Sequence, residues 1–193
     1  MTRGSAAWAA VAALLAAFAL IGGALPREAI DWQPALAFSQ PWRAVTAVGV
    51  HYSALHLVAN LVGAAVAALF GAVARVPPRL SLAWLAAWPL TQWGLLLKPE
   101  LTHFGGLSGV LHAGVAVVIA WLLIAGTRAQ RWVGGAVLIG LCAKLAGESP
   151  WGAALQHPAG WNIAVAPLSH ATGVIAGAVC AVIALLLRPR ASC

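Results

Sequence analysis

Charged residues are scarce in this chain. Only 8% of its 193 residues are Asp, Glu, Lys or Arg, whereas 62% are hydrophobic. A soluble globular domain usually carries about 25% charged residues. The shortage excludes a soluble domain and predicts an integral membrane protein of the all-α class, with a single domain over residues 1–193.

Cysteines are also few. The three of them, Cys142, Cys180 and Cys193, are too scattered for a disulfide framework, and no CxxC pair or zinc-type spacing occurs. Cys142 and Cys180 stand within apolar runs, where a free cysteine behaves as a small hydrophobic residue. We therefore expect neither a disulfide framework nor a zinc site built on these cysteines.

Acidic residues are the rarest charged group: four stand against eleven basic ones, for a formal net charge of +7. A basic balance can indicate nucleic-acid binding. Here, however, the basic residues lie in short loops between apolar runs, a distribution typical of membrane topology signals. We therefore expect no nucleic-acid partner.

Six apolar runs are candidates to cross the membrane, at approximately residues 5–25, 52–73, 80–97, 108–125, 132–147 and 168–187. The first, which follows Arg3, could instead be a cleaved signal peptide. Its full length and the lack of a small-x-small site before Pro26 favour a retained helix. Between the first two runs, residues 26–50 form a polar loop whose tryptophans, Trp32 and Trp42, suit the membrane interface.

Basic residues collect on one side of this six-span topology. The N-terminus, the 2–3 and 4–5 loops and the C-terminus carry no acid and seven arginines, namely Arg3, Arg75, Arg79, Arg128, Arg131, Arg188 and Arg190. The positive-inside rule then places both termini in the cytoplasm. Five spans, with the first run removed, would leave the orientation of the rest unchanged.

Polar residues recur at one depth of this topology. The second, fourth and sixth spans all begin near the outer face, and their first residues include His51 and His56, Ser108, and His170 respectively. Polar groups in a membrane are costly and usually face the protein interior or a water-filled cavity. We therefore expect these side chains to share a site near the outer face.

Ser108 is the predicted nucleophile. It lies in the stretch GGLSGVLH at residues 105–112, where glycines crowd the start of an apolar helix. Glycine lowers helix stability but lets another backbone approach closely. A serine hydroxyl needs a base to take its proton, and histidine is the usual one. The alternative is that the serine and glycines only cap the helix.

His170 is the predicted base. It shares a face of the sixth span with Gly173 and Gly177, while Gly109 and Ala113 offer small residues on the fourth span. Small residues spaced in this way let membrane helices approach closely, as a serine–histidine hydrogen bond of roughly 3 Å requires. The alternative for any one membrane histidine is a hydrogen-bonded structural residue.

No acid is expected to complete a triad. Glu148 is the only acid predicted nearby, and it could equally pair with Lys144 one helical turn earlier. We therefore predict a Ser–His dyad. Attack by the serine places a negative charge on the substrate oxygen, which needs hydrogen-bond donors. The donors expected are the Asn60 amide, His56 on the same helix face, and the Ser108 N–H at its helix start. The other histidines, His51, His103 and His157, are expected to be structural or loop residues.

Four motifs occur in a fixed order, the first in the loop after the first span and the others at the starts of the second, fourth and sixth spans: Trp42-Arg43, HYSALHLVAN at 51–60, GLSG at 106–109 and HATGVIAG at 170–177. With these motifs the chain resembles the rhomboid family of intramembrane serine proteases. The resemblance implies a six-helix rhomboid-like bundle without metal or cofactor, in which peptide bonds are hydrolysed near the outer membrane boundary. It assigns Ser108 as nucleophile, His170 as base and acid, and Asn60, His56 and the Ser108 amide as oxyanion donors. It gives the other motif residues a supporting role around these groups: Trp42, Arg43, His51, Gly106, Gly109, Gly173 and Gly177.

His112 departs from the common rhomboid pattern. It stands four residues after the serine, where many rhomboids have a tyrosine that packs against the catalytic histidine. An imidazole could stack there in its place. The short chain and the GGLSGVLH stretch are most similar to the rhombosortase subfamily.

That resemblance implies a protein of the bacterial inner membrane with its site toward the periplasm. Its partners would be membrane lipid and a single-pass membrane substrate with a glycine-rich C-terminal tail, of the GlyGly-CTERM sorting type. Two other classes remain open: a rhomboid-like protein that binds membrane helices without cutting them, and a membrane haem protein with His56 and His170 as axial ligands. A transporter is disfavoured because no inverted repeat is visible.

Overall fold

The computed structural model describes residues 2–187. These residues form helices and connecting loops, and the only β-structure among them is a pair of isolated bridges. The all-α prediction is therefore confirmed. Three residues named above lie outside the described range: Arg188 and Arg190, which serve as topology signals, and Cys193.

Five helices of the described chain are long and apolar enough to cross a membrane. They are α1 (Arg3–Gly22), α4 (Ala54–Val73), α5 (Pro78–Trp93, continued by the 3-10 helix η3, Gly94–Leu97), α6 (Ser108–Ala125) and α8 (Leu168–Leu186). Each overlaps one of the predicted spans, and α6 has the predicted bounds. Helices of this length and composition are those of a membrane protein.

The remaining predicted span falls in α7 (Arg128–Glu148), which is not one of these five helices. Charged side chains at both ends and several glycines lower its hydropathy. A capping box fixes its first turn: the Thr127 hydroxyl accepts from the Gln130 N–H, and the Gln130 side chain accepts from the Thr127 N–H. The helix is therefore well defined, although its composition is less apolar than that of the five.

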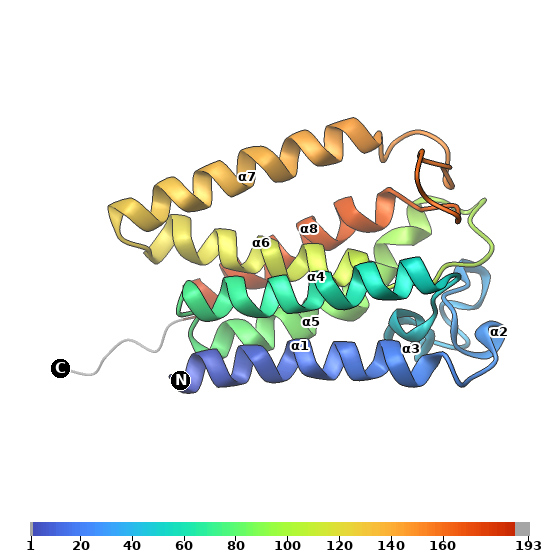
Figure 1. Cartoon of the computed structure of the whole chain (residues 1–193), viewed down its shortest axis with the longest axis horizontal. Coiled ribbons are helices and arrows are strands. Elements are labelled where there is room, and N and C mark those ends of the chain that lie inside the picture. The colour runs from blue at the N-terminus through green and yellow to red at the C-terminus, as the bar shows by residue number, and fades with distance from the viewer. Residues whose placement is uncertain (1, 188–193) are drawn as a thin grey trace.

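The helices lie side by side with their axes roughly parallel (Figure 1). Helices α4, α6 and α8 all begin at the end of the molecule where the short elements gather. Those elements are α2 (Arg27–Ile30), η1 (Pro34–Leu36), α3 (Arg43–Thr46) and η2 (Ala47–Gly49). The bundle thus places the starts of the three helices at a common end, while α7 runs along one edge beside α6.

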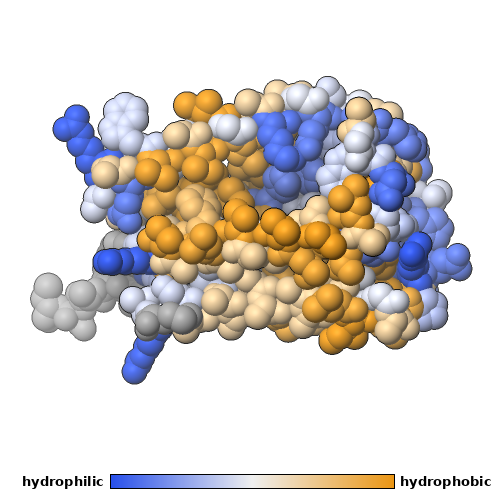
Figure 2. Space-filling model, in the orientation of Figure 1, coloured by the Kyte–Doolittle hydropathy of each residue, from blue (hydrophilic) through white to orange (hydrophobic). Residues whose placement is uncertain are grey.

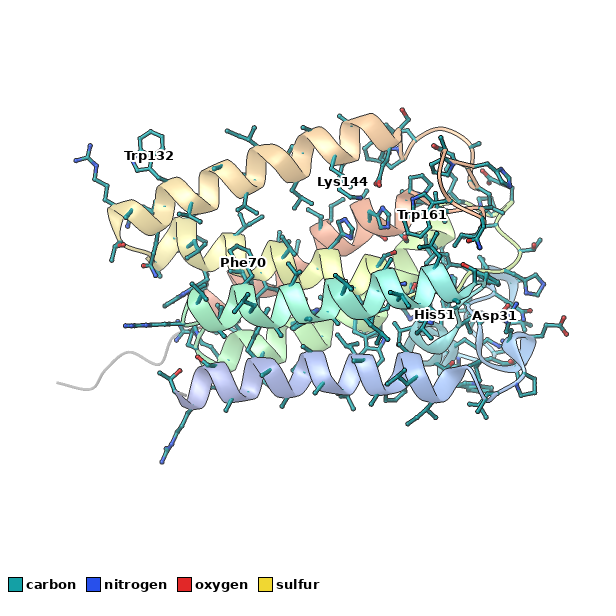
Figure 3. All side chains as sticks on the ribbon, viewed as in Figure 1. Asp31, His51, Phe70, Trp132, Lys144 and Trp161 are labelled. Atoms are coloured by element: carbon teal, nitrogen blue, oxygen red, sulfur yellow. The ribbon has the colours of Figure 1, made fainter. Side chains whose placement is uncertain are left out.

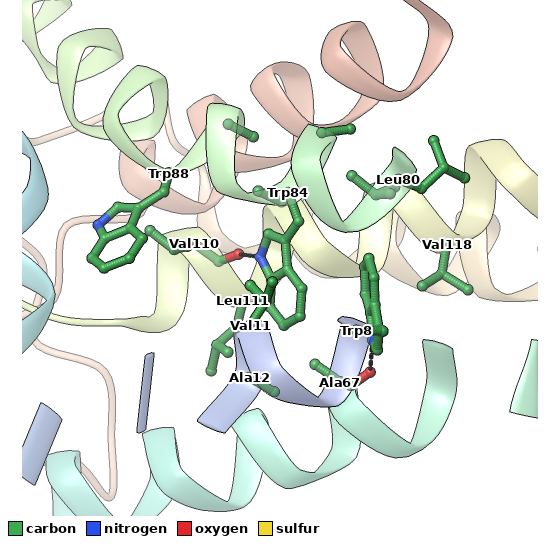
Figure 4. Packing of buried hydrophobic residues seen from close by; sticks show 14 of the residues in the cluster. Trp8, Val11, Ala12, Ala67, Leu80, Trp84, Trp88, Val110, Leu111 and Val118 are labelled. Atoms are coloured by element: carbon green, nitrogen blue, oxygen red, sulfur yellow. Dashed lines mark hydrogen bonds between the residues drawn. The ribbon is translucent and has the colours of Figure 1, made fainter. Parts of the chain in front are cut away.

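Tryptophans tie α1 into the centre of the bundle (Figure 4). The rings of Trp8 and Trp84, both fully buried, stack with their centroids 4.4 Å apart. Each indole N–H donates to a main-chain oxygen at 2.8 Å, Trp8 to Ala67 and Trp84 to Val110. A buried tryptophan needs such a partner for its N–H. Helix α1 is thus an integral part of the core.

The loop between α1 and α4 is more ordered than the sequence predicts. Arg43 Nη1 donates to Asp31 Oδ1 at 3.0 Å, and these residues are only 6% and 2% exposed. Trp32 is fully buried and pairs with Phe104 in one of the isolated bridges. The prediction that Trp32 lies at the membrane interface is therefore wrong. Trp42 is 53% exposed, as an interface residue would be. The ion pair therefore braces the loop internally, and the Trp32–Phe104 bridge joins it to the segment before α6.

Large apolar side chains are exposed along the outward faces of the long helices. The most exposed include Leu69, Val73, Ile139, Leu82 and Leu186. Figure 2 shows a hydrophobic band along the molecule and a hydrophilic area beside the C-terminal half of α7. The band suits contact with lipid, and the hydrophilic area marks the region of the candidate site.

Candidate active site

A cavity of about 670 Å³ lies along α4 as far as Ala67 and along α6 as far as Val115, and is closed by the first turn of α8, the C-terminal half of α7 and residues 155–167. Its walls contain His56, Asn60, Ser108 and His170, so the structure brings together the polar residues that the sequence places at one depth. Figure 3 shows Lys144 on the side of α7 that faces α8, and Trp161 over the same region. The cavity therefore joins groups from four helices.

Ser108 and His170 are in direct contact. The Ser108 Oγ and the His170 Nε2 lie 2.9 Å apart, a hydrogen-bond distance between the fourth and sixth predicted spans. Ser108 is the first residue of α6 and His170 lies in the first turn of α8. The pair is therefore held by two helix starts rather than by loops.

Small residues make this contact possible. A Cβ atom on Gly173 would collide with the main-chain oxygen of Gly109, and one on Gly177 with that of Ala113. A Cβ atom on Gly109 would lie 2.7 Å from the Ser169 oxygen. The backbones of α6 and α8 thus touch along the face that the spacing of these residues predicts. We call this contact the α6–α8 seam.

His170 has a second partner that the dyad prediction left out. Its Nδ1 lies 2.7 Å from Glu148 Oε2, and the other carboxylate oxygen accepts from Lys144 Nζ. Glu148 is therefore both in the expected ion pair with Lys144 and bonded to His170. One signal in the sequence could have revealed this contact. Glu148 stands at the outer end of its predicted span, and the fourth and sixth spans, which carry Ser108 and His170, begin at that same end.

His112 stacks on His170. Their ring centroids are 4.3 Å apart and the rings are inclined by 21°. The His112 Nδ1 lies 2.7 Å from the Ser108 carbonyl oxygen, so this nitrogen carries the proton and donates to it. The imidazole thus occupies the stacking position that the rhomboid resemblance assigns to a tyrosine, and it braces the His170 ring.

His56 and Asn60 form the α4 wall of the cavity. The Asn60 side chain is buried, and its Nδ2 has no hydrogen-bond partner among residues 2–187. Gly106 adopts a φ of +141°, which L side chains rarely adopt, and an added Cβ would lie 3.0 Å from the His56 ring. The GLSG segment can therefore approach α4 closely, and Asn60 keeps a free amide donor in the cavity wall.

The remaining predicted residues surround the site without entering its centre. His51 packs on His56 with a centroid distance of 4.8 Å. Burial lowers the pKa of His51, and its contact with the Gly49 carbonyl opposes this only in part, so the ring is neutral near pH 7. The His103 Nδ1 lies 2.7 Å from Asp31 Oδ2, at the cavity rim, where His157 also lies. Trp42 and Arg43 belong to the first loop and do not line the cavity.

Two polar attachments hold the segment between α7 and α8, and the sequence carries no signal for either. Ser53 Oγ donates to Asn162 Oδ1 at 2.8 Å. Lys98 Nζ donates to the main-chain oxygens of Gly152, at 2.6 Å, and Trp151, at 3.3 Å. These contacts fix the outer cover of the cavity, residues 149–167, at two separate points.

The assembled groups suit acyl transfer: a hydroxyl bonded to an imidazole, and in the same cavity the Asn60 amide, which has no partner within the described chain. Comparison with known protein families finds no matching model, and no curated protein matches the chain. The chemistry is therefore inferred from the geometry of the site and from the sequence motifs.

Proposed function

We propose that the chain is an intramembrane serine endopeptidase of the rhomboid type. The observation that carries the proposal is the 2.9 Å contact between Ser108 Oγ and His170 Nε2, within a cavity walled by apolar helices. A serine bonded to a histidine is the arrangement of a nucleophile with its general base.

In the first step, Ser108 Oγ attacks the carbonyl carbon of the scissile peptide bond, and its proton passes to His170 Nε2. The carbonyl oxygen becomes negatively charged. The donors available to it are the Asn60 amide and the Ser108 backbone N–H, which as the first of its helix has no intrahelical partner. His56, from the same wall, completes the proposed oxyanion site.

In the second step, the C–N bond breaks and the proton on His170 passes to the leaving amine, which gives an acyl ester on Ser108. A water molecule then attacks the ester while His170 takes its proton. The new acid leaves and the proton returns to Ser108 Oγ. No metal or cofactor takes part in this sequence.

The proposed substrate is a single-pass membrane protein with a glycine-rich C-terminal tail, cut near its glycines. This choice depends on the similarity of GGLSGVLH to the rhombosortases. The proposed location is the bacterial inner membrane, with α7 as a sixth span, both termini cytoplasmic and the site toward the periplasm. Its support is the cluster Arg75, Arg79, Arg128 and Arg131 at the end of the bundle opposite the cavity.

The test is cleavage of a tagged substrate with a glycine-rich motif, one transmembrane helix and an arginine cluster, co-expressed with the wild type, Ser108→Ala or His170→Ala. We expect cleavage by the wild type alone, with all three proteins folded. Cleavage by Ser108→Ala would remove Ser108 from the chemistry. If neither the wild type nor a variant cuts this substrate or a generic rhomboid substrate while all are folded, the protease proposal fails and the helix-binding alternative is favoured.

A further inference from the structure

We propose that Glu148 is a positioning residue for His170, so that the site acts as a Ser–His–Glu triad whose carboxylate is held by Lys144. This inference rests on the proposed function of Ser108 and His170. The inference goes beyond the proposed function because the nucleophile and base could also operate as a dyad. It also gives the Lys144–Glu148 pair on α7 a role in the reaction.

The two oxygens of Glu148 have different partners. Oε1 accepts from Lys144 Nζ, one helical turn earlier on α7, and Oε2 lies 2.7 Å from His170 Nδ1. Because Lys144 occupies one oxygen within the same helix, it limits the rotation of the carboxylate and leaves the other oxygen facing α8. An ion pair that served only α7 would not need this second contact.

The same contact decides the tautomer of His170. Lys144 Nζ also lies 3.4 Å from Nδ1, so Nδ1 could either accept from Lys144 or donate to Glu148. The carboxylate is closer by 0.7 Å (3.4 − 2.7), and a charge-assisted bond of that length is the stronger one. The proton is therefore assigned to Nδ1. Nε2 then directs its lone pair at Ser108 Oγ, as a general base must.

The carboxylate also faces the charge that forms during the reaction. When His170 takes the serine proton, its ring becomes positive, and Glu148 is the only acid beside it in the described chain. The other titratable groups around the ring come from the neighbouring helices: Ser108 and His112 on α6, Lys144 on α7 and His56 on α4. None of these supplies a negative charge at neutral pH, so the stabilisation of the imidazolium falls to Glu148.

The test compares Glu148→Gln with Glu148→Asp, Lys144→Met and the matched control Glu28→Gln, all in the full chain purified in detergent. Glu28 suits the control because its side chain is exposed and lies at the same end of the bundle, outside the cavity. Two rates are measured for each protein: covalent labelling of Ser108 by a fluorophosphonate probe, and cleavage of the tagged substrate. Thermal unfolding of each protein checks that it is folded.

We expect Glu148→Gln to slow both rates at least about tenfold. Loss of the carboxylate from a buried triad costs about 10⁴-fold, but the Glu148 side chain is 29% exposed, so the effect here is smaller. The acidic limb of the pH–rate profile should move to lower pH, because a neutral amide stabilises the imidazolium less. Glu148→Asp should recover part of the rate, Lys144→Met should cost less than Glu148→Gln, and Glu28→Gln should match the wild type.

Two outcomes would overturn the inference and leave the proposed function standing. In one, Glu148→Gln labels and cleaves like the wild type with an unchanged pH profile. In the other, Lys144→Met loses more activity than Glu148→Gln, which would make the lysine the group that acts on His170. If the wild type neither labels nor cleaves while Ser108→Ala behaves identically, the proposed function itself fails, and the triad with it.

Discussion

The two helices that supply His170 and Glu148 to the site, α8 and α7, are held there in opposite ways. At the α6–α8 seam the contact is between backbones, because Gly109, Gly173 and Gly177 have no side chains to separate the helices. Near the site, α7 instead reaches His170 of α8 through the end of a long side chain, Glu148, whose carboxylate is also bonded to Lys144. The difference indicates that the Ser–His distance is fixed by the fold, whereas the acid can move relative to both.

Burial follows the same division. In α8, nine residues are buried, among them the seam glycines, whereas in α7 only Gly134 and Leu141 are. An added Cβ on Gly134 would lie 3.0 Å from Leu122 on α6, near the end of α7 that is remote from the cavity. Helix α7 is therefore exposed along most of its length, with one buried residue in each half.

The largest effect on turnover is expected from Asn60→Ala. This variant tests whether α4, like α8, holds its polar group in a fixed place in the site. Asn60 is 4% exposed and its amide has no partner among residues 2–187, so its removal breaks no hydrogen bond of the resting protein. Loss of one oxyanion donor typically costs about 10²–10³ in turnover. Steady-state cleavage and thermal unfolding should show that loss with unchanged folding. Unchanged turnover would remove Asn60 from the site.

A smaller effect, about 10²-fold, is expected from Gly173→Ala, which acts directly on the seam. The added methyl group collides with the Gly109 oxygen and pushes α8 away from α6. A displacement of about 1 Å between reacting groups can cost this much in rate, and overpacking costs about 1–3 kcal/mol of stability. Fluorophosphonate labelling and unfolding in detergent would measure both. Wild-type labelling would show that the backbone contact does not set the Ser–His distance.

The smallest effect is expected from Gly140→Ala on α7. Nothing lies within 4 Å of a Cβ added there, and the residue is exposed. Alanine is more favourable than glycine inside a helix by up to about 1 kcal/mol, so the variant should unfold at the same temperature as the wild type or slightly above, with unchanged cleavage. A loss of activity comparable to that of Gly173→Ala would show that α7 is packed as tightly as α8, and the comparison would fail.

Patterns with a fixed period were predictable from the sequence. The bounds of α6 follow from the apolar run after Ser108, and the seam follows from the spacing of small residues at 109, 113, 173 and 177. Both depend only on helix geometry. The common end of α4, α6 and α8 follows equally from the alternating direction of successive spans.

Contacts that depend on side-chain conformation were not predictable. The sequence places Glu148 near the outer end of its helix, but whether its carboxylate meets Lys144, His170 or both depends on rotamers and on the tilt of α7. In the first loop, the buried pair of Arg43 and Asp31 needs a fold that carries both residues out of water. Neither the Glu148–His170 contact nor the Arg43–Asp31 pair has a spacing that could reveal it.

The attachment of Lys98 has a consequence for how such a chain can diversify. Its ammonium group donates to the main-chain oxygens of Trp151 and Gly152, and every amino acid has such an oxygen. Substitutions in this stretch can therefore accumulate without releasing the segment. Lineages could in this way change the side chains of this segment while its anchor to Lys98 stays the same.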